Sequence, residues 1–170
     1  SAGVSTQARQ AAADAAHYLL TLGHRRIALA AGPEDEVLTQ EHERGLAEAM
    51  AQAPLLVANG DGSVASGKEA ADALLDLSPA PSAILAANAE IALGVLRTAQ
   101  ARDIAVPGGL SVIALEDSAL AEWSHPPLSA MRHDWVEIVE SATRLVLSGD
   151  ESKAIDCRAT LLARGSVAAV

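Results

Sequence analysis

The sequence contains no phenylalanine, and its only aromatic residues are Tyr18, Trp123 and Trp135. Proteins that bind single-stranded nucleic acid use several aromatic side chains as stacking platforms for the bases, so the composition speaks against that function. Apolar residues nevertheless make up 50% of the chain, mainly as alanine, leucine and valine. We therefore expect a core of small side chains in which helices pack closely.

Cysteine and positive charge are scarce as well. The single Cys157 excludes an internal disulfide, fits a reducing compartment and is expected to pack rather than catalyse. Twelve lysines and arginines stand against 22 acidic residues, which gives a net charge of −10. Because DNA-binding surfaces need concentrated lysine and arginine, these residues are not expected to bind DNA directly.

Long apolar runs are also missing. None reaches the ~18 residues that a membrane span requires. The opening stretch SAGVSTQARQ lacks the basic and then apolar order of a secretion signal. A length of 170 residues suits one compact domain. We expect a soluble, cytoplasmic protein.

What the sequence does contain is an alternation of short apolar runs with longer amphipathic stretches. This alternation predicts a parallel sheet with helices on both faces, that is, an α/β fold. The expected helices span about 6–22, 36–50, 63–77, 88–103 and 135–146, and the expected strands span 26–31, 55–58, 82–86, 110–115 and 128–131, with weaker extended segments at 153–157 and 161–163.

Gly23 and His24 stand between the first helix and the first of these strands. Glycine ends a helix at low cost because it adopts the left-handed conformation. No nucleophile or metal-ligand cluster surrounds His24 in the sequence, so its ring nitrogens are expected to hold the turn.

Several catalytic motifs are suggested only weakly. GSVASGKE, residues 62–69, matches a phosphate loop except that Glu69 replaces the hydroxyl residue that would bind magnesium. Its residues also keep helical spacing. No serine has the Gly-x-Ser-x-Gly surroundings of a hydrolase, and the five histidines form no His-x-x-x-His pair. We expect no metal.

Ligands of open parallel sheets bind beyond the carboxyl ends of the strands, and four residues are candidates there. Glu116 follows an apolar strand and is expected either to accept hydrogen bonds from a ligand or to cap a turn. Asn88 is expected to contact a ligand or to cap its helix. His42 is expected to point into the crevice or to be an exposed polar residue. Trp135 lies in phase with an apolar helical stripe, which favours a core position.

Five segments occur in an order typical of one protein family. They read LLTLGHRRIALAAGP, HERGLAEAM, SAILAANAEIALGVLR, LSVIALEDSALAEWSHPPLSAMRHD and LLARGS. In this order they closely resemble the C-terminal half of the effector-binding domain of the LacI/GalR family of bacterial transcription regulators.

The resemblance implies one lobe of a periplasmic-binding-protein-like type I fold. Residues 1–170 are then the C-terminal part of an effector-binding and dimerisation domain, without the N-terminal helix-turn-helix and most of the first lobe. It further implies a homodimer, a small sugar-like or nucleoside-like effector, operator DNA bound only through the headpiece, no cofactor and no enzymatic activity. The alternatives are a solute-binding protein of a transport system, which shares the fold, and, less favoured, a phosphate-loop enzyme.

By position, the resemblance assigns six residues to the effector cleft. His42 stands where the family commonly has an arginine, and Glu116 where it has the first aspartate of Gly-Phe-Asp-Asp. A neutral histidine offers one donor and one acceptor, whereas arginine offers a rigid fork of donors, so these departures weaken the case for an ordinary sugar. The assigned residues are Gln10, His42, Asn88, Glu116, His133 and Trp135.

Overall fold

The structure is a computed structural model, and it describes residues 3–5, 7–51, 53–148 and 154–170. The helices are Ala8–Thr21 (α1), Val37–Met50 (α2), Val64–Leu75 (α3), Ala89–Ala101 (α4), Ala119–Trp123 (α5) and Trp135–Ser148 (α6). The strands are Gly3–Ser5 (β1), Ile27–Ala30 (β2), Leu56–Ala58 (β3), Ala83–Ala86 (β4), Ser111–Ala114 (β5), Ser129–His133 (β6), Ala154–Asp156 (β7) and Ala159–Leu162 (β8).

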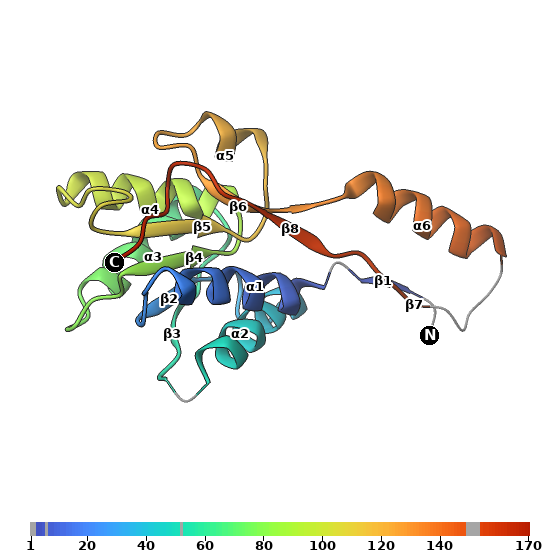
Figure 1. Cartoon of the computed structure of the whole chain (residues 1–170), viewed down its shortest axis with the longest axis horizontal. Coiled ribbons are helices and arrows are strands. Elements are labelled where there is room, and N and C mark those ends of the chain that lie inside the picture. The colour runs from blue at the N-terminus through green and yellow to red at the C-terminus, as the bar shows by residue number, and fades with distance from the viewer. Residues whose placement is uncertain (1–2, 6, 52, 149–153) are drawn as a thin grey trace.

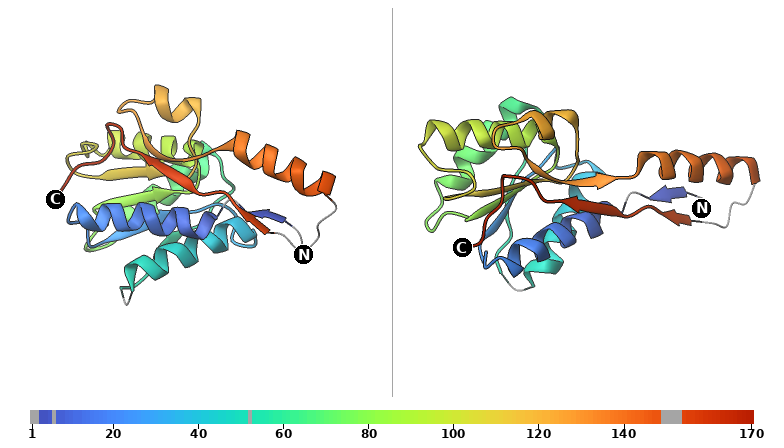
Figure 2. Two further views of the ribbon diagram at one scale, coloured as in Figure 1. Left: turned by 45° about the vertical axis from the view of Figure 1, so that its right-hand side comes forward. Right: turned by 45° about the horizontal axis from the view of Figure 1, so that its top comes forward.

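Six strands form the main sheet in the order β3-β2-β4-β5-β6-β8. All neighbours are parallel except β6 and β8, which run antiparallel. Helices cover both faces of the sheet, with α1 and α2 on one side and α3 and α4 on the other (Figures 1 and 2). The predicted α/β class is therefore confirmed.

Side chains of the central strands alternate between two separate cores. Ala28 and Ala30 of β2 face α3 and α4, whereas Ile27 and Leu29 face α1 and α2. Both faces are apolar because both are covered, which is why the strand reads as a continuous apolar run in the sequence. Alanine dominates the helical side of each core, as the composition predicted.

The turn between α1 and β2 has the predicted structural role. Gly23 has a φ of +98°, in the left-handed region. His24 is 1% exposed, and its Nε2 lies 3.0 Å from the carbonyl oxygen of Ala168. Because a carbonyl only accepts, Nε2 is the donor of this hydrogen bond, and Nδ1 forms a second one with the Ser82 hydroxyl at 2.8 Å.

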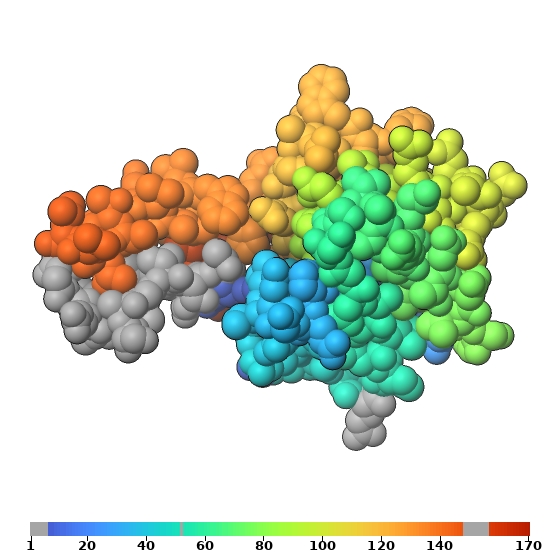
Figure 3. Space-filling model, turned by 180° about the vertical axis from the view of Figure 1, so that it is seen from behind, coloured from blue at the N-terminus to red at the C-terminus, as the bar shows by residue number. Residues whose placement is uncertain are grey.

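An arm extends away from the sheet and was not expected from the sequence. It contains α6 and the parallel pair of β1 and β7, and it projects beyond the body in Figures 1 and 3. The spacing of its apolar residues correctly predicts helix α6. The helix does not pack on the sheet, however, and Val139 and Val146 are exposed. The short strand β1 and helix α5 were also missed, because both are too short to show a period.

Candidate functional site

The candidate site lies where the parallel strands end. Strand β2 connects through α2 to β3 on one side, and the chain then crosses through α3 to β4 on the other side of β2. The strand order therefore reverses between β2 and β4, and such a switch point leaves a crevice outside the carboxyl ends of the two strands.

Two adjoining cavities occupy this crevice and share Leu38, His42, Ala87 and Glu116. The smaller, of about 190 Å³, is called the aromatic cavity, and the larger, of about 270 Å³, the acidic cavity. The aromatic cavity is completed by Ala8, Leu115, His133 and Trp135, and the acidic cavity by Gly32, Pro33, Glu36, Thr39, Asp61, Gly62 and Asn88.

His42 lies in the first turns of α2, between the two cavities. Its side chain is buried rather than exposed, with 3% of the residue accessible, and its Nδ1 has no hydrogen-bond partner. Burial, and to a smaller extent the nearby His133, lower the pKa of His42 to about 4. His42 is therefore neutral near pH 7, and the side chain that borders both cavities contains a buried ring nitrogen without a hydrogen bond.

The buried His42 makes stability depend on pH. The unfolded chain protonates His42 near its ordinary pKa of 6.5, whereas the folded protein does so near 4, so stability is lost as the pH falls between these values. We expect a loss of about 2 to 3 kcal/mol across this window. Urea unfolding at about pH 7.5 and pH 4.5 measures it. The variant His42→Gln should flatten the pH dependence, and an equally steep curve would show that another group is responsible.

Asn88 has the capping role that was one of its two predicted roles. Its Oδ1 accepts from the backbone N–H of Ile91 at 2.8 Å, which satisfies the first turn of α4. Its Nδ2 donates to the carbonyl of Gly62 at 3.0 Å and so fixes the loop before α3. The same residue lines the acidic cavity, where its amide retains a second N–H for a ligand.

Glu116, His133 and Trp135 form the opposite side of the crevice. Glu116 is exposed, and its carboxylate has no hydrogen bond or ion pair within the described residues. Trp135 is 52% exposed, so the core position that the helical stripe favoured is wrong. The rings of Trp135 and His133 lie 5.9 Å apart at a 48° tilt, and the buried Nδ1 of His133 has no partner.

Five of the six residues assigned by resemblance thus line one crevice, and Gln10 does not. Gln10 is exposed on α1 and donates from Nε2 to Asp14 Oδ1 at 2.7 Å. The sequence analysis missed Glu36 and Asp61, which add two carboxylates to the acidic cavity. The sequence indicates these two residues only by their position, since each stands in a loop that follows a strand of the sheet.

The catalytic alternatives find no support at this site. Ser63 caps α3 by accepting from the backbone N–H of Ser66 at 3.2 Å, and Gly67 and Lys68 lie inside that helix. The GSVASGKE segment is therefore a helix start and not a phosphate loop. Within the described ranges, no three histidine, cysteine or acidic side chains gather as metal ligands do. Nor is any helix of the described residues long and apolar enough to cross a bilayer.

The fold and the crevice define a lobe of the kind that binds small ligands at the edge of a Rossmann-like sheet. Residues 16–167 match the family described as periplasmic binding protein-like domain. The HTH-type transcriptional repressor CytR of Escherichia coli K12 is 33% identical over 172 residues, which cover 94% of this chain and 50% of that protein.

Solved structures give the same result. A regulatory protein of the LacI family from Chloroflexus aggregans superposes with a TM-score of 0.89 at 30% identity, over 100% of this chain and 65% of the other. The transcriptional regulator CelR, solved as a complex with cellobiose, superposes with a TM-score of 0.88 at 30% identity, over 97% and 54%.

The chain belongs to the periplasmic binding protein-like family, in the group formed by the LacI-family transcriptional regulators. It spans about half the length of the curated relatives that it matches. These relatives are named regulators and not transport proteins, so the regulator interpretation is favoured over the solute-binding alternative.

Proposed function

We propose that this chain is the ligand-sensing and dimerisation part of a cytoplasmic LacI-family repressor, and that it acts by binding and not by catalysis. The observation that carries the proposal is the crevice at the strand ends, in a chain whose family is that of DNA-binding regulators. Among the described residues, the exposed Glu116 carboxylate has no partner and is available there to a small sugar-like or nucleoside-like effector. The buried His42 borders the same crevice and leaves its Nδ1 without a hydrogen bond.

The arm supports the proposal that residues 1–170 are the C-terminal part of a two-lobed effector domain. Its helix α6 exposes large apolar side chains, including Val136 at 69% and Leu147 at 81%. Apolar surface of this kind is normally covered by a partner. In a two-lobed protein the first lobe covers it, and the effector lies between that lobe and the crevice. Operator DNA is then bound by a separate basic headpiece and not by these acidic residues.

Such a domain regulates DNA binding only if the effector prefers one arrangement of the two lobes. A differential affinity worth about 1–3 kcal/mol is typical of this coupling. The crevice contributes one wall of the site, and closure of the other lobe onto it changes the spacing of the headpieces in a dimer.

The experiment that tests this function measures operator binding of the whole regulator with and without effector. We expect Glu116→Ala to raise the effector concentration for half-maximal change in operator affinity by about tenfold or more, because a charged hydrogen-bond acceptor is lost. Thermal stability should hardly change, since Glu116 is exposed and unpaired. The control Glu69→Ala alters an exposed carboxylate on α3, outside the crevice. An unchanged effector response in Glu116→Ala would remove this residue from the site.

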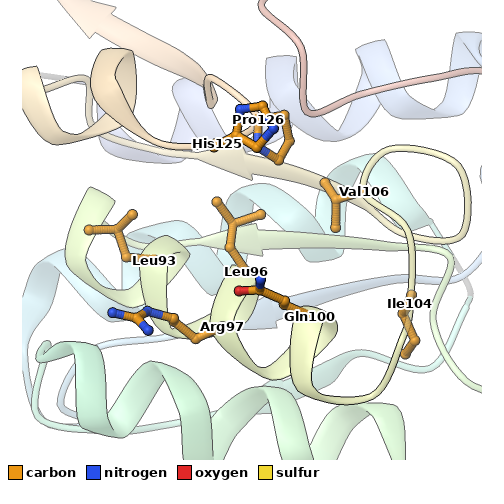
Figure 4. A pocket seen from close by; sticks show the side chains of 8 residues that line it. All are labelled: Leu93, Leu96, Arg97, Gln100, Ile104, Val106, His125 and Pro126. Carbon is orange, nitrogen blue, oxygen red and sulfur yellow. The ribbon is translucent and has the colours of Figure 1, made fainter.

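The proposed homodimer has a suitable surface on the side of α4 and α5. Trp123 is 84% exposed and Leu120 46%, which is unusual for large apolar residues. They lie near a groove of about 320 Å³ over α4, which Figure 4 shows from close by. The groove is lined by Leu93, Leu96, Arg97, Gln100, Ile104, Val106, His125 and Pro126.

We therefore expect Trp123→Arg to weaken dimerisation by about a hundredfold, because exposed aromatic side chains act as anchors at interfaces. Analytical ultracentrifugation of the whole regulator over a concentration series measures the effect. Leu55→Arg is the matched control, since Leu55 is also exposed but stands between α2 and β3 in the chain. Figure 1 shows these two elements on the opposite side of the body from α5. Equal dimer affinity in both variants would exclude this surface.

A further inference from the structure

The described lining of the crevice is rich in hydrogen-bond acceptors. Glu36, Asp61 and Glu116 bring three carboxylates to the acidic cavity. Among the described residues, neither lysine nor arginine lines this cavity or the aromatic one. Hydrogen bonding from the Ser63 side chain, and then from the Ser63 backbone N–H at 2.9 Å, lowers the pKa of Asp61, so this carboxylate stays charged near pH 7.

A cluster of carboxylates alone does not define a ligand site, but His42 adds an independent observation. Its side chain is almost fully buried, borders both cavities and leaves Nδ1 without a partner. A buried polar atom without a hydrogen bond is costly unless a ligand or water satisfies it. The ring remains neutral because it is desolvated, so it offers a hydrogen bond without offering positive charge.

The cations nearest in sequence to lining residues are already neutralised elsewhere. Arg9, which follows the lining residue Ala8, pairs with Glu48. Arg44 pairs with Glu41 on α2. Arg132 precedes His133 but pairs with Asp117 at 3.0 Å. None of these guanidinium groups is left to balance a negative charge on a ligand in the crevice.

Trp135 supplies an aromatic face at the edge of the aromatic cavity. It is half-exposed, and the His133 ring beside it, together with the Leu38 side chain, completes an apolar and aromatic wall. Such a wall packs against the face of a ring, and an indole also attracts an ammonium group through its π-electrons. Glu116 lines the same aromatic cavity, and Glu36 and Asp61 line the adjoining acidic cavity, so carboxylates are placed to accept hydrogen bonds from the edge of such a ring.

We infer that this site takes an uncharged or amine-bearing ring compound with several hydroxyl or amino donors, and that it rejects phosphorylated and carboxylated forms of the same ring. The inference rests on the effector-binding function proposed above. The reason is that a ligand phosphate would lie against like charges and find no lysine or arginine in the described lining of this wall of the site, whereas hydroxyl and amino groups meet carboxylate acceptors. Juxtaposed like charges at an interface reduce affinity strongly, so we expect the phosphorylated form to bind at least about a hundredfold more weakly.

The test uses the whole regulator and matched pairs of probes in a thermal-shift assay, followed by calorimetry on those that bind. The pairs are glucose with glucose 6-phosphate, glucosamine with glucosamine 6-phosphate, and the four ribonucleosides with their 5′-monophosphates. The stabilising member of a pair should be the one without phosphate. Glu116→Lys should reduce the ratio of the two dissociation constants within that pair by about tenfold or more. Glu69→Lys, outside the crevice, should leave this ratio unchanged.

A phosphorylated probe that binds as tightly as its partner, or an unchanged preference in a folded Glu116→Lys protein, would overturn the inference and leave the effector-binding function intact. Circular dichroism establishes that each variant is folded. If no probe of either kind binds, the proposed effector function fails, and the inference fails with it.

Discussion

Replacing Arg164 with methionine is expected to lower the free energy of unfolding by about 3 kcal/mol. The Arg164 guanidinium donates to both oxygens of Asp117, at 2.7 and 3.1 Å, and also to the carbonyl of Leu128 at 2.7 Å. Both side chains are mostly buried, at 15% and 10% exposure. Removal of Arg164 leaves the mostly buried Asp117 carboxylate with only the exposed Arg132 as an ionic partner. Loss of the buried partner of such a pair costs more than the pair itself contributes.

The pH dependence of this effect has a definite sign. Burial raises the pKa of Asp117, but Arg164 and Arg132 lower it by more, so the net pKa lies below its usual value. The stabilisation is therefore present above the ordinary aspartate pKa and is lost as the pH falls below it. Urea unfolding at about pH 7 should show the full difference between Arg164→Met and the parent protein, and the difference should shrink in acid.

Arg132→Met is the matched control for Arg164→Met. Arg132 donates to the same carboxylate from Nε at 3.1 Å, but its side chain is 56% exposed. An exposed pair contributes little, and we expect a loss of less than about 1 kcal/mol. If both variants lost the same stability, burial of the Asp117–Arg164 pair would not be the cause.

The second large effect is expected at the contact between α3 and α4. A Cβ on Gly94 would clash with the carbonyl oxygen of Val64 and lie 2.6 Å from the backbone nitrogen of Lys68. These are backbone atoms of a packed helix and do not move aside cheaply. Gly94→Ala should therefore destabilise the protein by about 3 kcal/mol, although alanine favours a helix by about 1 kcal/mol over glycine.

Gly94→Val should lower the free energy of unfolding more than Gly94→Ala does, because the larger side chain forces the helices further apart. Chemical denaturation measures both variants against Gly108→Ala, a control with its nearest contact at 3.6 Å and no expected loss from crowding. A stable Gly94→Val protein would show that α3 and α4 separate easily, contrary to the packing described above.

The sequence predicted these close helix contacts in general but not their positions. Abundant alanine and the absence of phenylalanine indicated a core of small side chains, and α3 and α4 do approach at Gly67 and Gly94. Nothing local distinguishes Gly94 from a glycine that merely lowers helix propensity. The distinction depends on which residues of another helix lie opposite, and that is a property of the packed structure.

The candidate site also has features that the sequence predicted and features that depend on the packed structure. The positions of Asn88 and Glu116 could be predicted, because side chains that follow parallel strands gather at one edge of a sheet. The neutral, buried state of His42 could not, because it depends on desolvation by several elements and on His133 far along the chain. Trp135 was misjudged for a similar reason, since its helix has an apolar period but no surface of the sheet to cover.

By itself, the sequence determined the alternation of strands and helices, the helix-ending turn at Gly23 and the family to which the chain belongs. These features depend on residues that are close together in the sequence: the hydrophobic period, the backbone preference of single residues, and short motifs. Only the tertiary structure decided that the described lining of the crevice is acidic and includes no lysine or arginine, that Gln10 is not among these lining residues, and that α6 extends away as an arm. Burial, unpaired polar atoms and cavity charge arise from contacts between residues distant in the chain, and no local pattern specifies them.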